Sequence, residues 1–366
     1  MAIPFVHIQA RGAYREIGRQ IGEAARAEVE ASVAFFRDNF ESMSGGLTFA
    51  EAEAQAAGYR RYAQRCLPQF VEELMGMAEG SRVPFSQLMV PNCGEEFTSS
   101  EPVVGEHHRG FARGGALGGD YCTAVAVSAN GRHVIGHNMD WYTIDAANNM
   151  MYDVTVPDGT RFLGIAGAAY LPMIGLNSHG IGNVSNSVHS DDNRVGVPNV
   201  FVRRWSLEAP TLEEARARGL LEARARGTNH FLTDTTGRLW DVETSATAGA
   251  FMESDSFMAH TNHYVAPEMA PYEGATFEES RTRLATAERM LAEGTARGDD
   301  PVELVASVLR GHETSPEECI CGHPAAAGLP AEQIMTVGSM ICDLDERRVH
   351  VCAGPPCENP YQVFEM

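Results

Sequence analysis

Cys122 and Asp140 are the side chains from which a chemical site can be built, because the sequence between them predicts a β-hairpin. Small and β-branched residues follow Cys122, and the Asn130-Gly131 pair then favours a two-residue type I′ turn. Such a turn places Cys122 opposite Met139, with Asn138 and Asp140 as its diagonal neighbours. An ideal ladder alternates side chains between its two faces, so the strands must bend or bulge there for these groups to act together.

The chemistry open to this hairpin is nucleophilic attack by Cys122 on a carbonyl carbon. A cysteine nucleophile needs a base that makes the thiolate, and donors for the oxyanion that develops on the attacked carbonyl. If the peptide bond before Cys122 is cut, the new α-amino group, with an ordinary pKa of roughly 7.7–8.0, can act as that base. Asp140 could orient the amine or thiol, and Asn262, within His260–Tyr264, is the candidate oxyanion donor. Structural roles stay open for all three: a buried cysteine, a hairpin carboxylate and a turn asparagine.

Other motifs offer different chemistry. His137, His260 and His263 lie beside the motifs just named, so a Cys-His pair is an alternative. The tract Cys319–His323 resembles a metal-binding sequence, but it lacks a fourth ligand at zinc-finger spacing. A metal-binding module built on Cys319, Cys321 and His323 is a further hypothesis. The glycine-rich stretch Gly164–Ala169 lacks the strand-turn-helix context of a nucleotide site.

The composition is that of a globular protein with a large core. The chain has 366 residues, of which 44% are hydrophobic and 21% are charged. Lysine and arginine total 28 against 49 acidic residues, and the net charge of −21 disfavours nucleic acid or an anionic membrane surface as a partner. A small-molecule substrate fits better, and homo-oligomerisation is left open.

The sequence predicts a cytoplasmic protein with reduced thiols. The N-terminus lacks the basic and apolar regions of a signal peptide, and no apolar run reaches the length of a membrane span. The eight cysteines do not follow the rhythm of a disulfide framework, and the chain is too long to need one.

The elements around the hairpin predict helices first and packed sheets afterwards. Apolar residues recur at helical spacing from Ile17 to Phe40, Thr48 can cap a second helix, and Pro68 separates that helix from a third. Residues 101–119 read as an exposed loop. A strand is predicted at Ile3–Gln9, before the first helix. Beyond the hairpin, strands are predicted at Tyr152–Val156, Phe162–Ala166, Met173–Leu176, Ile181–Val188, Phe231–Thr233, Leu239–Val242, Phe257–His260, Ile334–Cys342 and Val349–Cys352, and helices after Thr211, at Glu278–Glu293 and at Pro301–Leu309. This order suggests an α+β fold of packed sheets with helical layers outside.

Several of these motifs together resemble the isopenicillin N acyltransferase-like members of the N-terminal-nucleophile (Ntn) hydrolases, over nearly the whole chain. The matching pieces are Tyr14–Gly18 with Gly22, Asp120–Thr123, His137–Trp141, Gly180–Asn186, Gly196–Pro198 and His260–His263. The resemblance implies a four-layer αββα sandwich and self-cleavage before Cys122. Residues 1–121 would then form a helical light chain and residues 122–366 a heavy chain, both within one domain.

The resemblance also implies the roles of three residues. Cys122 would be the nucleophile and, through its freed amine, the general base; Asp140 would support it; Asn262 would help to form the oxyanion hole. We therefore expect an amidohydrolase or acyltransferase that works through an acyl-cysteine intermediate on a small-molecule amide or acyl donor, without metal or cofactor. Tyr121, a bulky residue before the cysteine, keeps open an unprocessed relative that binds a small ligand without turnover.

Overall fold

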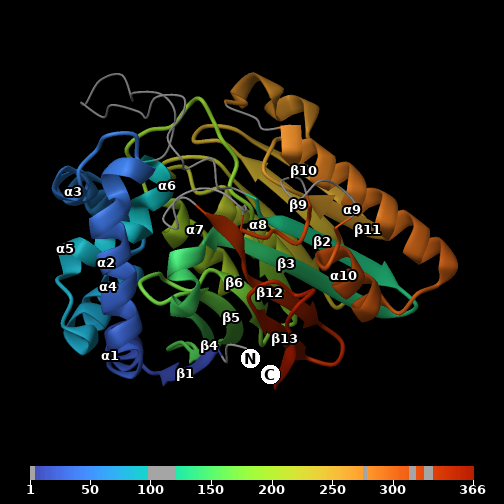
Figure 1. Ribbon diagram of the computed structural model, residues 1–366, viewed down its shortest axis with the longest axis horizontal. Helices are drawn as coiled ribbons and strands as arrows, with labels where there is room; N and C mark the ends of the chain where they lie inside the picture. Colours follow the sequence, from blue (N-terminus) through green and yellow to red (C-terminus); the bar gives the residue numbers. More distant parts are fainter. Residues whose placement is uncertain (1–4, 98–120, 275–277, 313–318, 325–332) are drawn as a thin grey trace.

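The structure is a computed structural model that describes residues 5–97, 121–274, 278–312, 319–324 and 333–366. The loop expected at 101–119, and Asp120 beside the cysteine, lie outside the described residues. The rest forms two β-sheets with helices on their outer faces and a group of helices at one end (Figure 1).

The larger sheet has eight strands among the described residues, and only its first pair is parallel. Its strand order is β1 (Val6–Arg11), β4 (Asn149–Thr155), β5 (Arg161–Gly167), β6 (Ile174–Asn177), β7 (Ile181–Val184), β8 (Thr228–Asp234), β9 (Leu239–Thr244) and β10 (Gly249–Ser254). The second sheet has six, in the order β11 (Phe257–His260), β2 (Thr123–Ala129), β3 (Arg132–Tyr142), β12 (Ile334–Asp343), β13 (Arg348–Ala353) and β14 (Gln362–Glu365).

Strand β2 shows how the layers are built. Ala124 and Ala126 point into the core between the two sheets, whereas Val125 and Val127 point into the core under α9 (Glu278–Arg297) and α10 (Pro301–Leu309). This period-two alternation buries both faces of the strand. Since α7 (Asn199–Leu207) and α8 (Leu212–Gly219) pack on the larger sheet, the order helix, sheet, sheet, helix confirms the predicted αββα sandwich.

The hairpin that carries the candidate chemistry has the predicted register. Thr123 pairs with Asn138, and Asn130 and Gly131 both have positive φ, as a type I′ turn requires. The irregularity expected between the two hairpin strands is not found in their ladder from Thr123 to Ala129, and a register shift lies instead on the other side of β3. The register of β12 against β3 shifts between Thr336 and Gly338, next to Asp140.

The N-terminal helices are α1 (Tyr14–Ala24), α2 (Arg26–Met43), α3 (Phe49–Cys66), α4 (Pro68–Ser81), α5 (Phe85–Met89) and α6 (Gly94–Phe97), with short 3₁₀ turns at Pro91–Cys93, Thr143–Asn148 and Pro267–Tyr272 elsewhere in the chain. The Thr48 capping box and the break at Pro68 are as predicted. The single helix expected from Ile17 to Phe40 is in fact two, interrupted at Ala25. Helix α1 packs closely on α4, since a Cβ on Gly18 would lie 1.7 Å from a backbone oxygen of α4, and Arg26, directly after the interruption, donates to the Gly80 carbonyl.

Residues on either side of Cys122 share one core. Strand β1 pairs with β4, and side chains from α1 to α5 pack with those of α7. At the centre, the fully buried Arg204 of α7 forms ion pairs with Glu73 of α4 at 3.1 Å and with Glu208 at 2.5 Å, and Tyr14 of α1 donates to Glu208 at 2.8 Å.

No helix in the described part of the chain is both long enough and apolar enough to cross a lipid bilayer. Helices α5, α6 and α7 and strands β10 and β14 were not predicted from the sequence.

Candidate active site

Cys122 and Asp140 line one cavity of about 100 Å³ at the open end of the β2–β3 hairpin. Its other walls include β5, β6, α6, α7 and the segment around Ser187, and Met139 and Ile165 are among the apolar side chains that face it. The structure therefore brings together the thiol and the carboxylate that the hairpin register predicted. The cysteine is partly accessible, whereas the carboxylate is buried.

Asp140 has one oxygen bound and one oxygen without a partner. Its Oδ1 accepts a hydrogen bond of 2.7 Å from Thr336, whereas its buried Oδ2 has no hydrogen-bond partner among the described residues. Burial raises the pKa of Asp140 to about 7, although Thr336 and the Arg283 guanidinium both favour the charged form. An unpartnered carboxylate oxygen at a cavity wall is placed to bind a cationic group.

Arg283 is a central residue of the site that the sequence analysis missed. Its Nη1 donates to the backbone oxygens of Tyr121 at 2.7 Å and Cys122 at 2.8 Å. Its Nη2 donates to Oδ1 of Asn262 at 2.9 Å, and the guanidinium carbon lies 5.5 Å from the centre of the Tyr121 ring. Arg283 is buried on α9, beside Leu284 and one turn before Ala287. A charged residue on the apolar face of a predicted helix was the feature of the sequence that could have pointed to it.

Asn262 is joined to Cys122 through this guanidinium and does not itself line the cavity. The side chain is buried, and its Nδ2 donates to the carbonyl of Ser187, a residue of the cavity wall, at 3.0 Å. An amide nitrogen carries two hydrogens, so one remains for a further acceptor. Asn138 and Asn186 differ, because each already makes two contacts through Nδ2: Asn138 with two backbone carbonyls, and Asn186 with the carbonyl and ring of one histidine.

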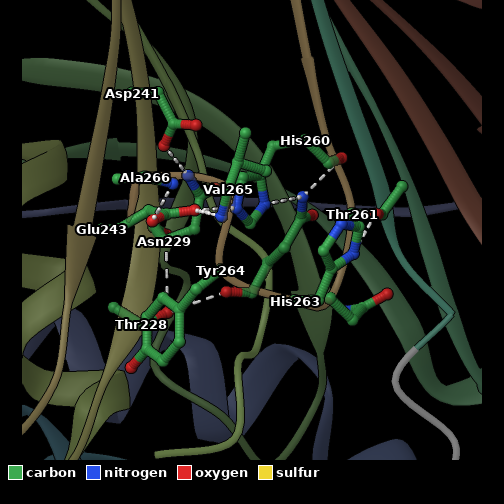
Figure 2. A network of polar contacts seen from close by, with 12 residues as sticks. Thr228, Asn229, Asp241, Glu243, His260, Thr261, His263, Tyr264, Val265 and Ala266 are labelled. Carbon is green, nitrogen blue, oxygen red and sulfur yellow. Dashed lines mark hydrogen bonds and ion pairs between the residues drawn. The ribbon is translucent and has the colours of Figure 1, made fainter. Parts of the chain in front are cut away.

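A buried polar network holds the segment that carries Asn262 (Figure 2). Nε2 of His260 lies 2.9 Å from Oε1 of Glu243, and the two oxygens of Glu243 accept the backbone N–H groups of Val265 and Ala266 at 2.6 and 3.0 Å. Burial acts to lower the pKa of His260, but the nearby carboxyls of Asp241 and Glu243 outweigh it and raise that pKa. The acidic groups Asp241 and Glu243 thus have hydrogen-bond partners within the protein. We therefore assign them the role of holding the segment that carries Asn262, and not that of metal ligands.

The three candidate histidines occupy different environments. His260 is engaged with Glu243, and Nδ1 of His263 lies 2.8 Å from the hydroxyl of Ser280. His137 alone of the three lines the cavity with Cys122, and its Nε2 is 3.0 Å from Oδ1 of Asn186. Burial lowers the pKa of His137 to about 4. It is therefore the histidine to test against an α-amine as the base.

Comparison with known proteins agrees with the resemblance seen in the sequence. The family model of acyl-coenzyme A:6-aminopenicillanic acid acyl-transferase matches residues 127–321, which is more than half of the chain. A relative from Emericella nidulans, the 40 kDa form of acyl-coenzyme A:6-aminopenicillanic-acid-acyltransferase, is 22% identical over 261 residues, covering 70% of this chain and 69% of that protein.

Two solved structures show a looser likeness. Penicillin V acylase from Agrobacterium tumefaciens has a TM-score of 0.44 and 15% identity, over 67% of this chain and 86% of that one. A variant of the conjugated bile acid hydrolase from Clostridium perfringens has a TM-score of 0.44 and 10% identity, over 67% of this chain and 97% of that one.

Proposed function

The chain belongs to the acyl-coenzyme A:6-aminopenicillanic acid acyl-transferase family, and from this we propose that it is a cysteine-dependent Ntn amidohydrolase or acyltransferase that matures by cutting itself before Cys122. The family match begins at residue 127, beyond the cysteine, and the geometry around Cys122 supports its role as the nucleophile. The observation that carries the proposal is the hydrogen bond of 2.7 Å from Arg283 to the carbonyl oxygen of Tyr121. That carbonyl belongs to the bond that self-cleavage would break.

In the maturation step, the Cys122 thiol gives up its proton and its sulfur attacks the Tyr121 carbonyl carbon. Arg283 stabilises the negative charge that develops on the carbonyl oxygen. The C–N bond then breaks, the amine of Cys122 takes up the proton, and a thioester remains. Water hydrolyses the thioester, which leaves a carboxylate on Tyr121 and a free thiol and amine on Cys122.

In turnover, the freed α-amine deprotonates the thiol, and the sulfur attacks the carbonyl carbon of a substrate amide. The remaining amide hydrogen of Asn262 is the proposed donor to the oxyanion, which requires the substrate carbonyl to reach past Ser187 in the cavity wall. The substrate amine leaves with the proton, and the acyl group passes to water or to a second amine. The unpartnered Oδ2 of Asp140 is the proposed site for the α-ammonium form of Cys122.

We expect residues 1–121 and 122–366 to stay together as one domain after cleavage. The pairing of β1 with β4 and the buried ion pairs of Arg204 join the two segments independently of the bond at Cys122. The substrate is a small-molecule amide or acyl donor, because the cavity measures only about 100 Å³ and has apolar walls such as Met139 and Ile165. A cytoplasmic location would keep the thiol reduced.

Mass spectrometry of the purified full-length protein tests the proposal. The expected result is two chains, one ending at Tyr121 and one beginning at Cys122, while Cys122→Ala stays whole. A matched control is Cys66→Ser, which alters a partly buried cysteine on α3 and should cleave normally. Cleavage of Cys122→Ala at the same bond would assign the cut to a protease. An intact wild-type chain would favour the small-ligand-binding relative.

A further inference from the structure

Four potential metal ligands converge about the segment that precedes β12. They are His312, Cys321, His323 and Cys357, and one ligand atom from each lies within 4.8 Å of all the others. His312 follows α10, Cys321 and His323 belong to the segment 319–324, and Cys357 lies between β13 and β14. Because they come from three stretches of chain, no zinc-finger spacing was visible in the sequence. Cys319, which the sequence grouped with them, instead directs its thiol to the backbone oxygen of Cys321 at 2.9 Å.

Four of the six distances between these ligand atoms are close to the edges of a tetrahedron around one ion. Zinc lies about 2.3 Å from a cysteine sulfur and about 2.0–2.1 Å from a histidine nitrogen, so tetrahedral edges are roughly 3.3 Å between nitrogens and 3.8 Å between sulfurs. The two sulfurs are 3.5 Å apart and the two Nε2 atoms 2.9 Å apart. Nε2 of His323 is 3.8 Å from the sulfur of Cys321 and 3.2 Å from that of Cys357.

The surroundings suit a metal centre. Nδ1 of His323 lies 3.5 Å from a carboxylate oxygen of Glu358, the kind of outer partner that orients a histidine whose Nε2 binds metal. Cys321 is buried and its backbone N–H donates to the carbonyl of Gly311 at 3.1 Å, while His312 and Cys357 are exposed and open a path to solvent.

We propose that His312, Cys321, His323 and Cys357 form a structural Zn²⁺ site. Both cysteines bind as thiolates and both histidines as neutral imidazoles, so binding releases two thiol protons to solvent and leaves a site without net charge. Four protein ligands leave no open position on a tetrahedral ion, and the site is therefore structural rather than catalytic.

The site has a structural connection to Asp140. The backbone N–H of Gly322, between two of the ligands, donates to the hydroxyl of Thr336 at 2.9 Å, and that hydroxyl donates to Asp140. The carbonyl of Ile320 accepts from Asn138 at 3.0 Å. The segment 319–324 contains no helix or strand, so a metal that ties it to α10 and to the β13–β14 connection would fix the backbone that positions Asp140.

The first test measures the zinc content of the purified full-length protein, kept in reducing buffer, by elemental mass spectrometry. We expect about one zinc per chain in the wild type and in the control variants Cys319→Ser and Cys66→Ser. His312→Ala and Cys357→Ser, which change exposed side chains, should fold by circular dichroism but weaken zinc binding at least roughly a hundredfold, more than the usual effect of losing an outer partner.

Cobalt gives a second readout that needs no variant. Wild-type protein stripped by a chelator and loaded with Co²⁺ should show the visible bands of a tetrahedral ion and a thiolate charge-transfer band, both lost in Cys357→Ser. Absence of zinc together with no Co²⁺ uptake by the reduced wild type would overturn the proposal. So would a Cys321–Cys357 disulfide in protein kept under reducing conditions, or equal zinc in wild type and the two ligand variants.

Discussion

The guanidinium of Arg283 donates a hydrogen bond of 2.9 Å to the side-chain oxygen of Asn262. A guanidinium has only donors, so the amide oxygen must face it and the amide nitrogen must face the carbonyl of Ser187. The contact therefore fixes which way the asparagine points, and it connects the proposed oxyanion donor of turnover to the proposed donor of self-cleavage.

Asn262→Ala should lower kcat by roughly a hundredfold or more, the usual scale for losing one oxyanion donor. KM should change little, because the donor acts on charge that develops after binding. Steady-state kinetics of the cleaved variant check this, with Asn39→Ala, on α2 away from the cavity, as the control. Activity within a few-fold of wild type in a folded variant would remove Asn262 from the mechanism.

Arg283→Met should slow self-cleavage roughly a hundredfold, because the Tyr121 oxyanion loses its donor. The rate is followed by denaturing electrophoresis of protein made by cell-free translation. Arg281→Met is the matched control, since Arg281 is an exposed arginine on the same helix. Arg283→Lys keeps the charge in the buried position and should cleave at an intermediate rate. Equal cleavage rates for Arg283→Met and Arg281→Met would contradict the assignment.

The pKa of Asp140 predicts how stability depends on pH in the uncut Cys122→Ala protein. Its folded pKa is about 7, above the ordinary value near 4, so between these values the folded state holds a proton that the unfolded state has lost. The free energy of unfolding therefore falls as pH rises from about 4 to about 7. Adding Asp140→Asn should flatten this part of the profile, as measured by urea unfolding at several pH values. An unchanged slope would show that Asp140 ionises normally.

Arg204→Met should lower the free energy of unfolding by about 3–5 kcal/mol, because it leaves Glu73 and Glu208 buried without their cation. Urea unfolding measures this loss. Arg37→Met, which removes an exposed pair with Asp38, should have a small effect. In the cleaved protein, the light chain of Arg204→Met should dissociate from the heavy chain at a lower urea concentration than that of the wild type. Equal stability of Arg204→Met and Arg37→Met would show that the ion pairs of Arg204 do not join the two segments.

The hairpin and the site differ in how far sequence could predict them. Local rules place Cys122 near Asp140, because Asn130-Gly131 determines the turn and the turn determines the register. Arg283 could not be predicted in the same way, since its contacts with Tyr121 and Asn262 join residues more than a hundred positions apart or on different elements.

The same limit explains the missed elements and the cluster of metal ligands. Helix α7 carries arginines on its buried side, so the apolar periodicity that marks a core helix was weak there. The sulfur of Cys357 lies near that of Cys321 because β12 pairs with β13, and this pairing brings the residues after β13 close to the segment that follows α10. Long-range pairing determines such contacts, and spacing along the sequence does not report it.

Two groups could act as the base that activates Cys122: its own α-amine and the imidazole of His137. If the base is the α-amine of Cys122, activity should rise with pH roughly between 6.5 and 8, as that amine loses its proton. If the base is His137, whose pKa burial lowers to about 4, the imidazole is already neutral at pH 6 and activity should not follow that rise. The experiment measures kcat/KM against pH for wild type and His137→Ala, and then for wild type whose heavy-chain amine has been selectively blocked, with mass spectrometry confirming a free thiol. We expect the blocked enzyme to be inactive and His137→Ala to keep the wild-type pH profile. Retained activity after blocking, with loss in His137→Ala, would replace the α-amine by a Cys-His pair.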